Sequence, residues 1–398
     1  MATTRTRAAR EAGKLPDLST KKLATYLYDR LRLPRQTDRK TGSTTTKEVV
    51  GRRLMLRYPD QIGEVGRLVL EHRKIRKTME FLDEGKLDPD GRLRCTYKFT
   101  TIMGRLASSE SPKGTGRNHQ NIQRSVRDVF IPEDGRLFME VDASQAEDRV
   151  VKVLAYGVTG RQDLLDRARA MPWENDEHKR AAAIIFKVTV DAVTKEQRFL
   201  GKKTRHAGNY DEGGQTHADN VLKESGIVLT IDEAQAMIDA IHAADPDIRV
   251  WQQATRALIL RDRCLANSWG RILAFDHARL DHDTNRQGYA FIPQSEVADL
   301  LNQRGLVPLW HWLRQQRMQS RITVQAHDAL LMNVVPEEAW AIWQFLKASM
   351  ERPRHYNGVS LVIPVEVKLG RTWAGDWEAK KPPTRDEFEA ALTTLLRR

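Results

Sequence analysis

Cysteine is scarce in this chain: Cys95 and Cys264 are the only two among 398 residues. Two distant cysteines provide neither a disulfide framework nor a cysteine-rich metal site, which suits a reducing compartment. No apolar run approaches the roughly 20 residues that a membrane-spanning helix needs. The basic N-terminal stretch lacks an apolar core segment and therefore does not predict a secretory signal. These absences argue against a disulfide-stapled secreted domain and a membrane protein. They favour a cytoplasmic location, with an organellar one left open.

Acidic residues are outnumbered by basic ones. Lys and Arg total 65 against 53 Asp and Glu, which gives a net charge of +12 and an isoelectric point near 9.7. An excess of this size usually accompanies a polyanionic partner, so the charge favours nucleic-acid binding. The alternative is an ordinary basic surface that is well solvated.

The apolar pattern predicts many helices around a small sheet, after a loose basic arm over residues 1–13. The expected helices cover 17–33, 49–82, most of 143–266, 286–318 with interruptions at Pro293 and Pro308, and 337–350. The expected strands lie within 88–99, over 136–142, in a short hairpin at 267–276, twice within 321–335, and over 360–368. We therefore predict an α+β fold: an antiparallel sheet, a large helical insertion and a helical N-terminal part.

Two aspartates occupy strand ends. Asp142 ends the apolar strand LFMEV, and Asp328 lies at the turn between strands ITVQ and LLMNVV. An acid at the end of a buried strand is costly unless it is paired or metal-bound. If adjacent strands bring the two together, they form a site for divalent cations. On spacing alone, both could equally be turn acids of an ordinary hairpin.

The residues around these acids resemble known motifs. VDASQAEDR (141–149) resembles the first carboxylate motif of the DNA polymerase I family (family A), Asp-Tyr-Ser-Gln-Ile-Glu-Leu-Arg, and VQAHDALLMNV resembles its last motif, Val-His-Asp-Glu. Further segments resemble family pieces in family order; they cover 103–109, 118–123, 176–198, 286–301 and 364–377.

The resemblance implies a right-hand polymerase. It comprises a partial thumb over 1–87, palm segments over 88–155 and 286–398, and fingers over 156–285. The implied function is template-directed DNA synthesis with two Mg²⁺ ions, for which Mn²⁺ can substitute, on primer–template DNA and deoxynucleoside triphosphates. A monomer without a 3′–5′ exonuclease domain is expected, and a processivity factor is left open. The implied site residues are Asp142, Ala143 and Asp328 for metal; Gln145, Glu147, His178, Arg198, Lys202, His206 and Tyr210 for the nucleotide, Lys202 being also catalytic; and Arg105, Arg286, Gln294 and His327 for DNA.

Within the fingers, the stripe Arg198, Lys202, His206 and Tyr210 resembles the family pattern Arg-x₃-Lys-x₃-Phe/Tyr-x₃-Tyr-Gly on one helical face. Two registers fit. If the helix is read from Asn209, Tyr210 is the ring that stacks on the nucleotide, and the resemblance then implies poor exclusion of nucleotides without a 3′-hydroxyl. If it is read from Glu196, Arg198 and Lys202 match and the tyrosine comes one turn late. Glu147 resembles the family residue that excludes a ribose 2′-hydroxyl.

Several residues depart from the family pattern. Ala329 stands where the family usually has a glutamate beside the second aspartate, and the thumb is short. Two alternatives therefore stay open: a truncated or decayed polymerase that only binds DNA, and a related polymerase with RNA as template or product. Glu147 argues against an RNA product.

Overall fold

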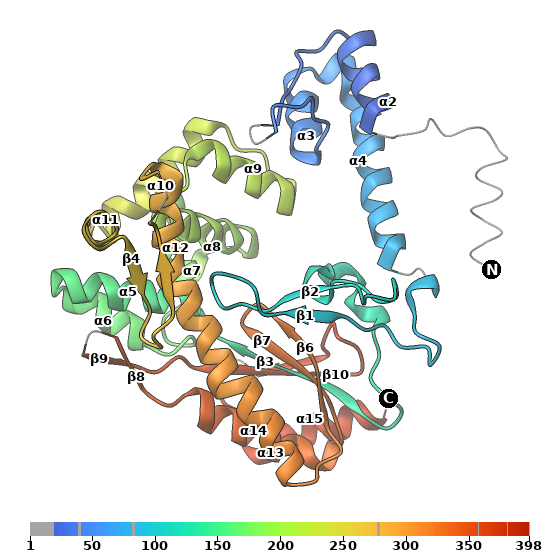
Figure 1. Cartoon of the computed structure of the whole chain (residues 1–398), viewed down its shortest axis with the longest axis vertical. Helices are drawn as coiled ribbons and strands as arrows, with labels where there is room; N and C mark the ends of the chain where they lie inside the picture. Colours follow the sequence, from blue (N-terminus) through green and yellow to red (C-terminus); the bar gives the residue numbers. More distant parts are fainter. Residues whose placement is uncertain are drawn as a thin grey trace. The chain divides into compact units, whose positions relative to one another are not determined.

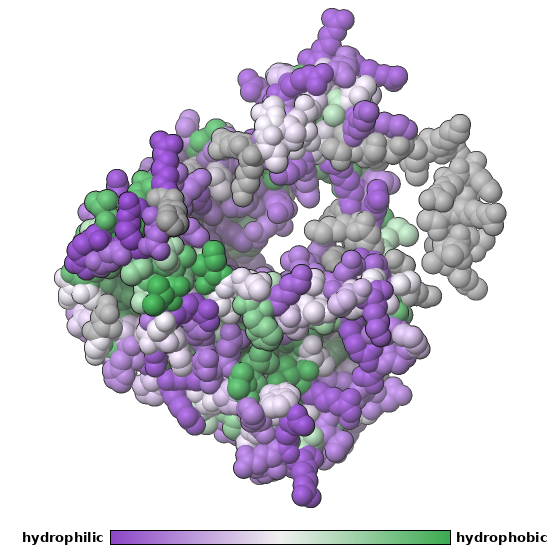
Figure 2. Space-filling view, in the orientation of Figure 1, coloured by the Kyte–Doolittle hydropathy of each residue, from purple (hydrophilic) through white to green (hydrophobic). Residues whose placement is uncertain are grey.

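The computed structural model describes residues 20–38, 41–81, 84–276, 279–356, 358–379 and 381–397. These fall into two units. One contains the residues up to Leu82 together with Ala218–Leu229, and the other contains Asp83–His217 with Thr230–Arg398. The predicted basic arm and the start of the first predicted helix lie outside the described residues. The surface drawn in Figure 2 is mostly hydrophilic, in keeping with a charged fraction of 30%.

The larger unit is built on a five-stranded sheet of order β11-β10-β3-β7-β6, antiparallel throughout. Its strands are β3 (Leu137–Ala143), β6 (Arg321–Ala326), β7 (Ala329–Val334), β10 (Val365–Gly370) and β11 (Trp377–Ala379). Alternate residues of β3, such as Met139 and Val141, are fully buried. The helices α13 (Val307–Gln315), α14 (Pro336–Met350) and α15 (Arg385–Arg397) pack on this sheet (Figure 1). The predicted antiparallel sheet is confirmed, while β11 and α15 were not foreseen.

Helices make up most of the rest of this unit. They are α5 (Ala146–Thr159), α6 (Gln162–Arg169), α7 (Glu177–Phe186), α8 (Lys195–Asn209), α9 (Gly214–Ser225), α10 (Ile231–Ala244), α11 (Asp247–Asp262), α12 (His282–Leu300) and the π-helix η6 (Leu301–Leu306), with α9 continuing into the smaller unit. Local sequence explains the boundaries: Asp176 caps α7, and Thr194 with Gln197 forms a capping box on α8. The predicted interruption at Pro293 is wrong, because α12 runs through it.

Short elements complete the larger unit. The strands are β1 (Thr96–Lys98) with β2 (Ala107–Ser109), β4 (Cys264–Ala266) with β5 (Ile272–Ala274), and β8 (Arg354–Tyr356) with β9 (Val359–Leu361); the 3₁₀ turns are η2 (Glu84–Lys86), η3 (His119–Asn121), η4 (Arg124–Val129) and η5 (Val190–Ala192). The hairpin predicted at 267–276 exists, with its strands on either side of Asn267–Gly270. The strand predicted at 360–368 is instead two strands, β9 and β10.

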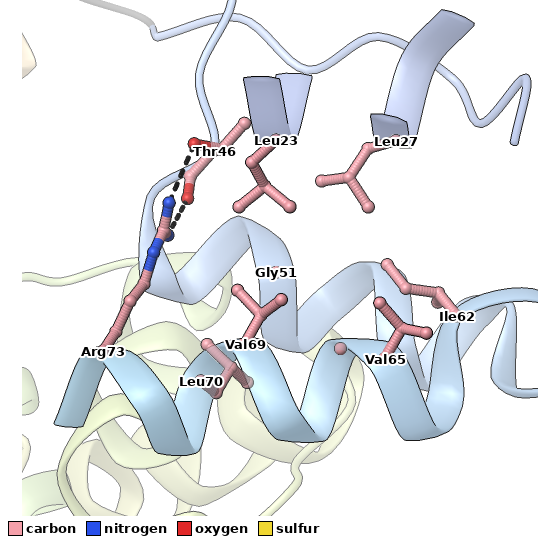
Figure 3. Close-up of a pocket in the computed structure, with 10 residues that line it drawn as sticks. Leu23, Leu27, Thr46, Gly51, Ile62, Val65, Val69, Leu70 and Arg73 are labelled. Carbon is pink, nitrogen blue, oxygen red and sulfur yellow. Dashed lines mark hydrogen bonds between the residues drawn. The ribbon is translucent and has the colours of Figure 1, made fainter. Parts of the chain in front are cut away.

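The smaller unit contains α2 (Thr20–Ala24), the π-helix η1 (Thr25–Arg30), α3 (Glu48–Arg57) and α4 (Pro59–Phe81). The long helix predicted over 49–82 is therefore two helices. Proline favours the first turn of a helix and disfavours helical geometry in the residue before it, so Pro59 ends one helix and begins the next. Leu23 and Leu27 pack toward α4 around a cavity of about 10 Å³ (Figure 3), which is too small for a ligand. Arg73 on α4 donates to the carbonyl and hydroxyl of Thr46, so this cation supports the loop before α3.

Candidate active site

The two aspartates at the strand ends lie side by side. Strands β3 and β7 are neighbours, with Asp142 opposite Ala329, and the amide of Ala143 donates to the carbonyl of Asp328 over 3.2 Å. His327 precedes Asp328 in a left-handed conformation (φ 55°), which turns the chain sharply between β6 and β7. The antiparallel pairing thus joins residues that are far apart in the sequence.

The electrostatics of this pair fit a cation. One carboxylate oxygen of Asp142 (Oδ1) is buried and accepts no hydrogen bond from the described residues. Burial, and then the negative charge of Asp328, raise the pKa of Asp142 well above its ordinary value. Burial, and then the charge of Glu147, also raise the pKa of Asp328. Lys202 opposes both shifts, so its positive charge lies within electrostatic range of both acids.

No cluster of three or more His, Cys, Asp or Glu side chains suited to a metal ion occurs in the described part of the chain. Two carboxylates are nevertheless a suitable donor set for Mg²⁺, which keeps several waters and takes its remaining ligands from substrate phosphates.

A further carboxylate, missed in the sequence, flanks Asp142. Glu366 on β10 pairs directly with Asp142 on β3, on the side opposite to Ala329. Its Oε1 accepts a hydrogen bond of 2.7 Å from the hydroxyl of Ser144. Alternation along PVEVK placed Glu366 on a strand, but only the register between β3 and β10 reveals its neighbour.

A buried glutamine, Gln325, holds the turn at His327–Asp328 and was also missed in the sequence. The side-chain amide of Gln325 donates to the carbonyl of His327 over 2.7 Å. Its own backbone accepts from the hydroxyl of Tyr97 at 2.8 Å, and its Oε1 accepts from Gln120 at 3.1 Å. These contacts hold the turn that presents Asp328.

Glu147 lies in the first turn of α5 and is held from two sides. One carboxylate oxygen pairs with the guanidinium of Arg105, and the other accepts a 2.5 Å hydrogen bond from the hydroxyl of Tyr210. Arg105 is therefore bound to Glu147 in addition to its predicted contact with DNA.

Helix α8 presents three of the predicted nucleotide-binding residues. Lys202 and His206 are exposed and Arg198 is half-buried, each one turn from the next. Nε of Arg198 donates to Asp176 over 2.7 Å. Helices α7 and α8 approach closely at Gly201, where an added Cβ would lie 2.4 Å from the carbonyl oxygen of His178. The glycine thus lets His178 lie beside the cations of α8. Burial and the charge of Lys202 lower the pKa of His178 to about 4, which keeps its ring neutral.

Tyr210 differs from the rest of the stripe. It forms the C-cap of α8, is only 5% exposed, and directs its hydroxyl to Glu147. The ring of His206 lies edge-on against it, with ring centroids 4.7 Å apart. The exposed ring on the face of Arg198 and Lys202 is therefore His206.

The remaining predicted residues lie around this centre. Gln145 adopts a left-handed conformation before α5. On α12, Nε of Arg286 donates to the carbonyl of Tyr210 over 3.4 Å, and Gln294 lies half-buried two turns further along. His327 is exposed. The structure thus brings together the residues predicted to bind metal, Glu147 and the predicted nucleotide-binding cations. Among the described residues, the side chain of Gln294 forms no hydrogen bond to any of them.

Comparisons with known proteins identify the family and the fold. The family model described as DNA polymerase family A matches residues 1–375. The chain belongs to DNA polymerase family A. The predicted family is confirmed, and so is the α+β polymerase fold. Among curated relatives, DNA polymerase I of Pseudomonas aeruginosa is 26% identical over 373 residues, which cover 89% of this chain and 38% of that protein. DNA polymerase I of Thermus aquaticus is 28% identical, with 91% and 42% covered, and the DNA polymerase of Bacillus phage SP01 is 24% identical, with 91% and 40% covered.

A solved structure shares the fold. It is described as the POL domain of Pol1 from M. smegmatis in complex with DNA primer-template and dNTP. The TM-score is 0.72 at 24% identity, and the match covers 92% of this chain and 63% of that one. The chain spans about two fifths of the length of the curated relatives cited above. Among the described residues, no helix has both the length and the apolar character needed to cross a bilayer.

Proposed function

We propose that this chain is a template-directed DNA polymerase that adds deoxynucleotides to the 3′ end of a primer. The observation that carries the proposal is the adjacency of Asp142 and Asp328 at the ends of neighbouring strands, within electrostatic range of Lys202. Membership of family A and the +12 charge support it.

Asp142 and Asp328 would hold Mg²⁺, and the buried, unpartnered Oδ1 of Asp142 is suited to a cation. When bound, the ions would supply Lewis-acid activation of the primer 3′-hydroxyl and neutralise charge on the triphosphate. Glu366 adds negative charge beside Asp142, on the strand opposite to Ala329.

The chain's own cations would bind the triphosphate. Lys202 projects from α8 as an exposed ammonium, and Arg198 lies one turn before it. Ionic hydrogen bonds to phosphate are about twice as strong as neutral ones. His178, neutral because its pKa is lowered to about 4, can donate one N–H without adding charge.

The burial of Tyr210 favours one register of the fingers helix. Because Tyr210 is buried and bonded to Glu147, we propose the register read from Glu196, in which His206 is the ring that faces the nucleotide. Tyr210 then orients Glu147, and Glu147 excludes the ribose 2′-hydroxyl. This assignment favours DNA over RNA as the product.

A primer-extension assay tests the proposal. Purified chain, a labelled primer on a DNA template and deoxynucleoside triphosphates should give Mg²⁺-dependent extension directed by the template. Ribonucleotides, and an RNA template, should be used at least about a hundredfold less well, a difference of about 2.7 kcal/mol at the transition state. DNA binding without extension would instead support a DNA-binding remnant.

A further inference from the structure

Six charged side chains form a closed ring of ion pairs among the helices that carry proposed nucleotide-binding residues. The links run Asp148–Lys152, Lys152–Glu177 (3.1 Å), Glu177–Arg167 (2.8 Å), Arg167–Asp245 (2.7 Å), Asp245–Arg205 (2.5 Å) and Arg205–Asp148 (2.8 Å). Signs alternate around the ring, so each charge has two partners of opposite sign. Three acids and three bases leave the ring neutral.

The ring is buried. Lys152 and Asp245 are 0% exposed and Arg205 is 2% exposed. Although burial alone would raise it, Lys152 and Arg205 hold the pKa of Asp148 well below its ordinary value. A buried charge without a partner of opposite sign is strongly destabilising. The helices that carry the ring therefore cannot separate without leaving an uncompensated charge.

The position of the ring points to a role in nucleotide selection. Three of its members are adjacent in sequence to proposed site residues on three different helices: Asp148 follows Glu147 on α5, Glu177 precedes His178 on α7, and Arg205 precedes His206 on α8. Of the remaining members, Lys152 is also on α5, Arg167 is on α6, and Asp245 is the C-cap of α10. Each of the three site residues is thus one peptide bond away from a side chain that the ring holds in place.

The link between α5 and α8 departs from the family motif. The first carboxylate motif has leucine at the place of Asp148, whereas this chain has an acid there that pairs with Arg205. Nδ2 of Asn209, one turn further along α8, also donates to Asp148 over 3.0 Å. Both contacts join the helix that carries Glu147 to the helix that carries Lys202 and His206.

We propose that the ring fixes Glu147, His178 and His206 relative to one another, and that Asp148 and Arg205 are positioning residues for nucleotide selection. This inference rests on the proposed polymerase function. A displacement near 1 Å can change rates about a hundredfold, so loss of the link affects substrate discrimination even though no ring member needs to touch the nucleotide.

The decisive variant is Asp148→Leu combined with Arg205→Leu. It removes one charge of each sign and leaves the chain Lys152–Glu177–Arg167–Asp245 alternating and neutral. Asp148→Asn alone leaves the ring with an extra positive charge. The control is Arg161→Gln, which breaks the ion pairs of Arg161 with Asp163 (2.5 Å) and with Asp247 (2.7 Å) in the same unit and replaces neither a site residue nor a ring member.

Single-nucleotide extension kinetics and hydrogen exchange are measured for each variant. We expect the balanced double variant to fold, with a melting temperature close to that of the wild type. Its KM for deoxynucleotides should rise about tenfold, and its discrimination against ribonucleotides should fall about tenfold, with kcat changed less. Amide exchange should quicken together in α5, α7 and α8. Arg161→Gln should change none of these quantities.

Unchanged KM and discrimination in a folded double variant would overturn the proposal, as would faster exchange confined to one helix. A loss of kcat that is proportional to the unfolded fraction, with unchanged discrimination against ribonucleotides, would mean that the ring only stabilises the fold. That result would also overturn the proposal. If the wild type extends no primer, the polymerase assignment fails, and coupled exchange of the three helices then still decides whether the ring joins them.

Discussion

Replacing Tyr210 by phenylalanine separates the two registers of α8, because only the hydroxyl is lost. That hydroxyl donates to Glu147 over 2.5 Å, while Arg105 holds the other carboxylate oxygen. A hydrogen bond to a charged group contributes about 1.5–3 kcal/mol, and about 1.4 kcal/mol corresponds to a tenfold change in rate. Because Arg105 still restrains Glu147, we expect the lower end of that range. Discrimination against ribonucleotides should fall about tenfold.

Dideoxynucleotide use should stay within about twofold of wild type in Tyr210→Phe, because the hydroxyl faces Glu147 and not the sugar 3′-position. The assay compares kcat/KM for deoxy-, ribo- and dideoxynucleotides in single-nucleotide extension. Tyr356→Phe is a matched control: Tyr356 is 3% exposed, and its buried hydroxyl has no partner among the described residues. The reasoning would be refuted if Tyr210→Phe lowered dideoxynucleotide use strongly and left ribonucleotide discrimination intact, because Tyr210 would then be the ring that stacks on the nucleotide.

Other substitutions test separate parts of the site. Glu147→Ala should raise ribonucleotide use at least about tenfold over wild type, and more than Tyr210→Phe does. Equal discrimination in wild type and variant would show that Glu147 does not exclude the 2′-hydroxyl. Gly201→Ala should raise the KM for deoxynucleotides about tenfold, because its Cβ would meet the carbonyl of His178 at 2.4 Å; Gly213→Ala, where a Cβ meets nothing within 4 Å, should behave like wild type. Although burial alone would raise it, Lys152 and Arg167 lower the pKa of Glu177 from 4.5 to about 2. The stability that Glu177 contributes is therefore present above pH 4.5 and lost as the pH falls toward 2, so the difference in melting temperature between wild type and Glu177→Gln should shrink over that range, and a constant difference would contradict the shift.

Much of the fold could be predicted because local signals were strong. The apolar run within 136–142 and the turn at His327–Asp328 predicted β3, β6 and β7, which the structure confirms. The break at Pro59 could have been foreseen from proline's preference for the first helical turn, whereas the continuation of α12 through Pro293 depends on packing that the sequence pattern does not show.

The site was only partly predictable, for a physical reason. Asp142, Asp328 and Glu147 stand in recognisable motifs, but the position of Glu366 beside Asp142 depends on the register between β3 and β10. The two registers of α8 could not be separated by spacing, since every candidate lies four residues from the next. The burial of Tyr210 distinguishes it from His206, and burial depends on tertiary packing.

The central claim is that Asp142 and Asp328 together support nucleotide incorporation. The most direct test measures single-nucleotide extension by wild type, Asp142→Asn and Asp328→Asn at several Mg²⁺ concentrations, with primer–template binding measured alongside. We expect each substitution to remove nearly all incorporation and to leave DNA binding equal to or tighter than that of the wild type, because a negative charge near the phosphates is lost. A variant that binds DNA normally and keeps more than about a tenth of the wild-type rate would contradict it.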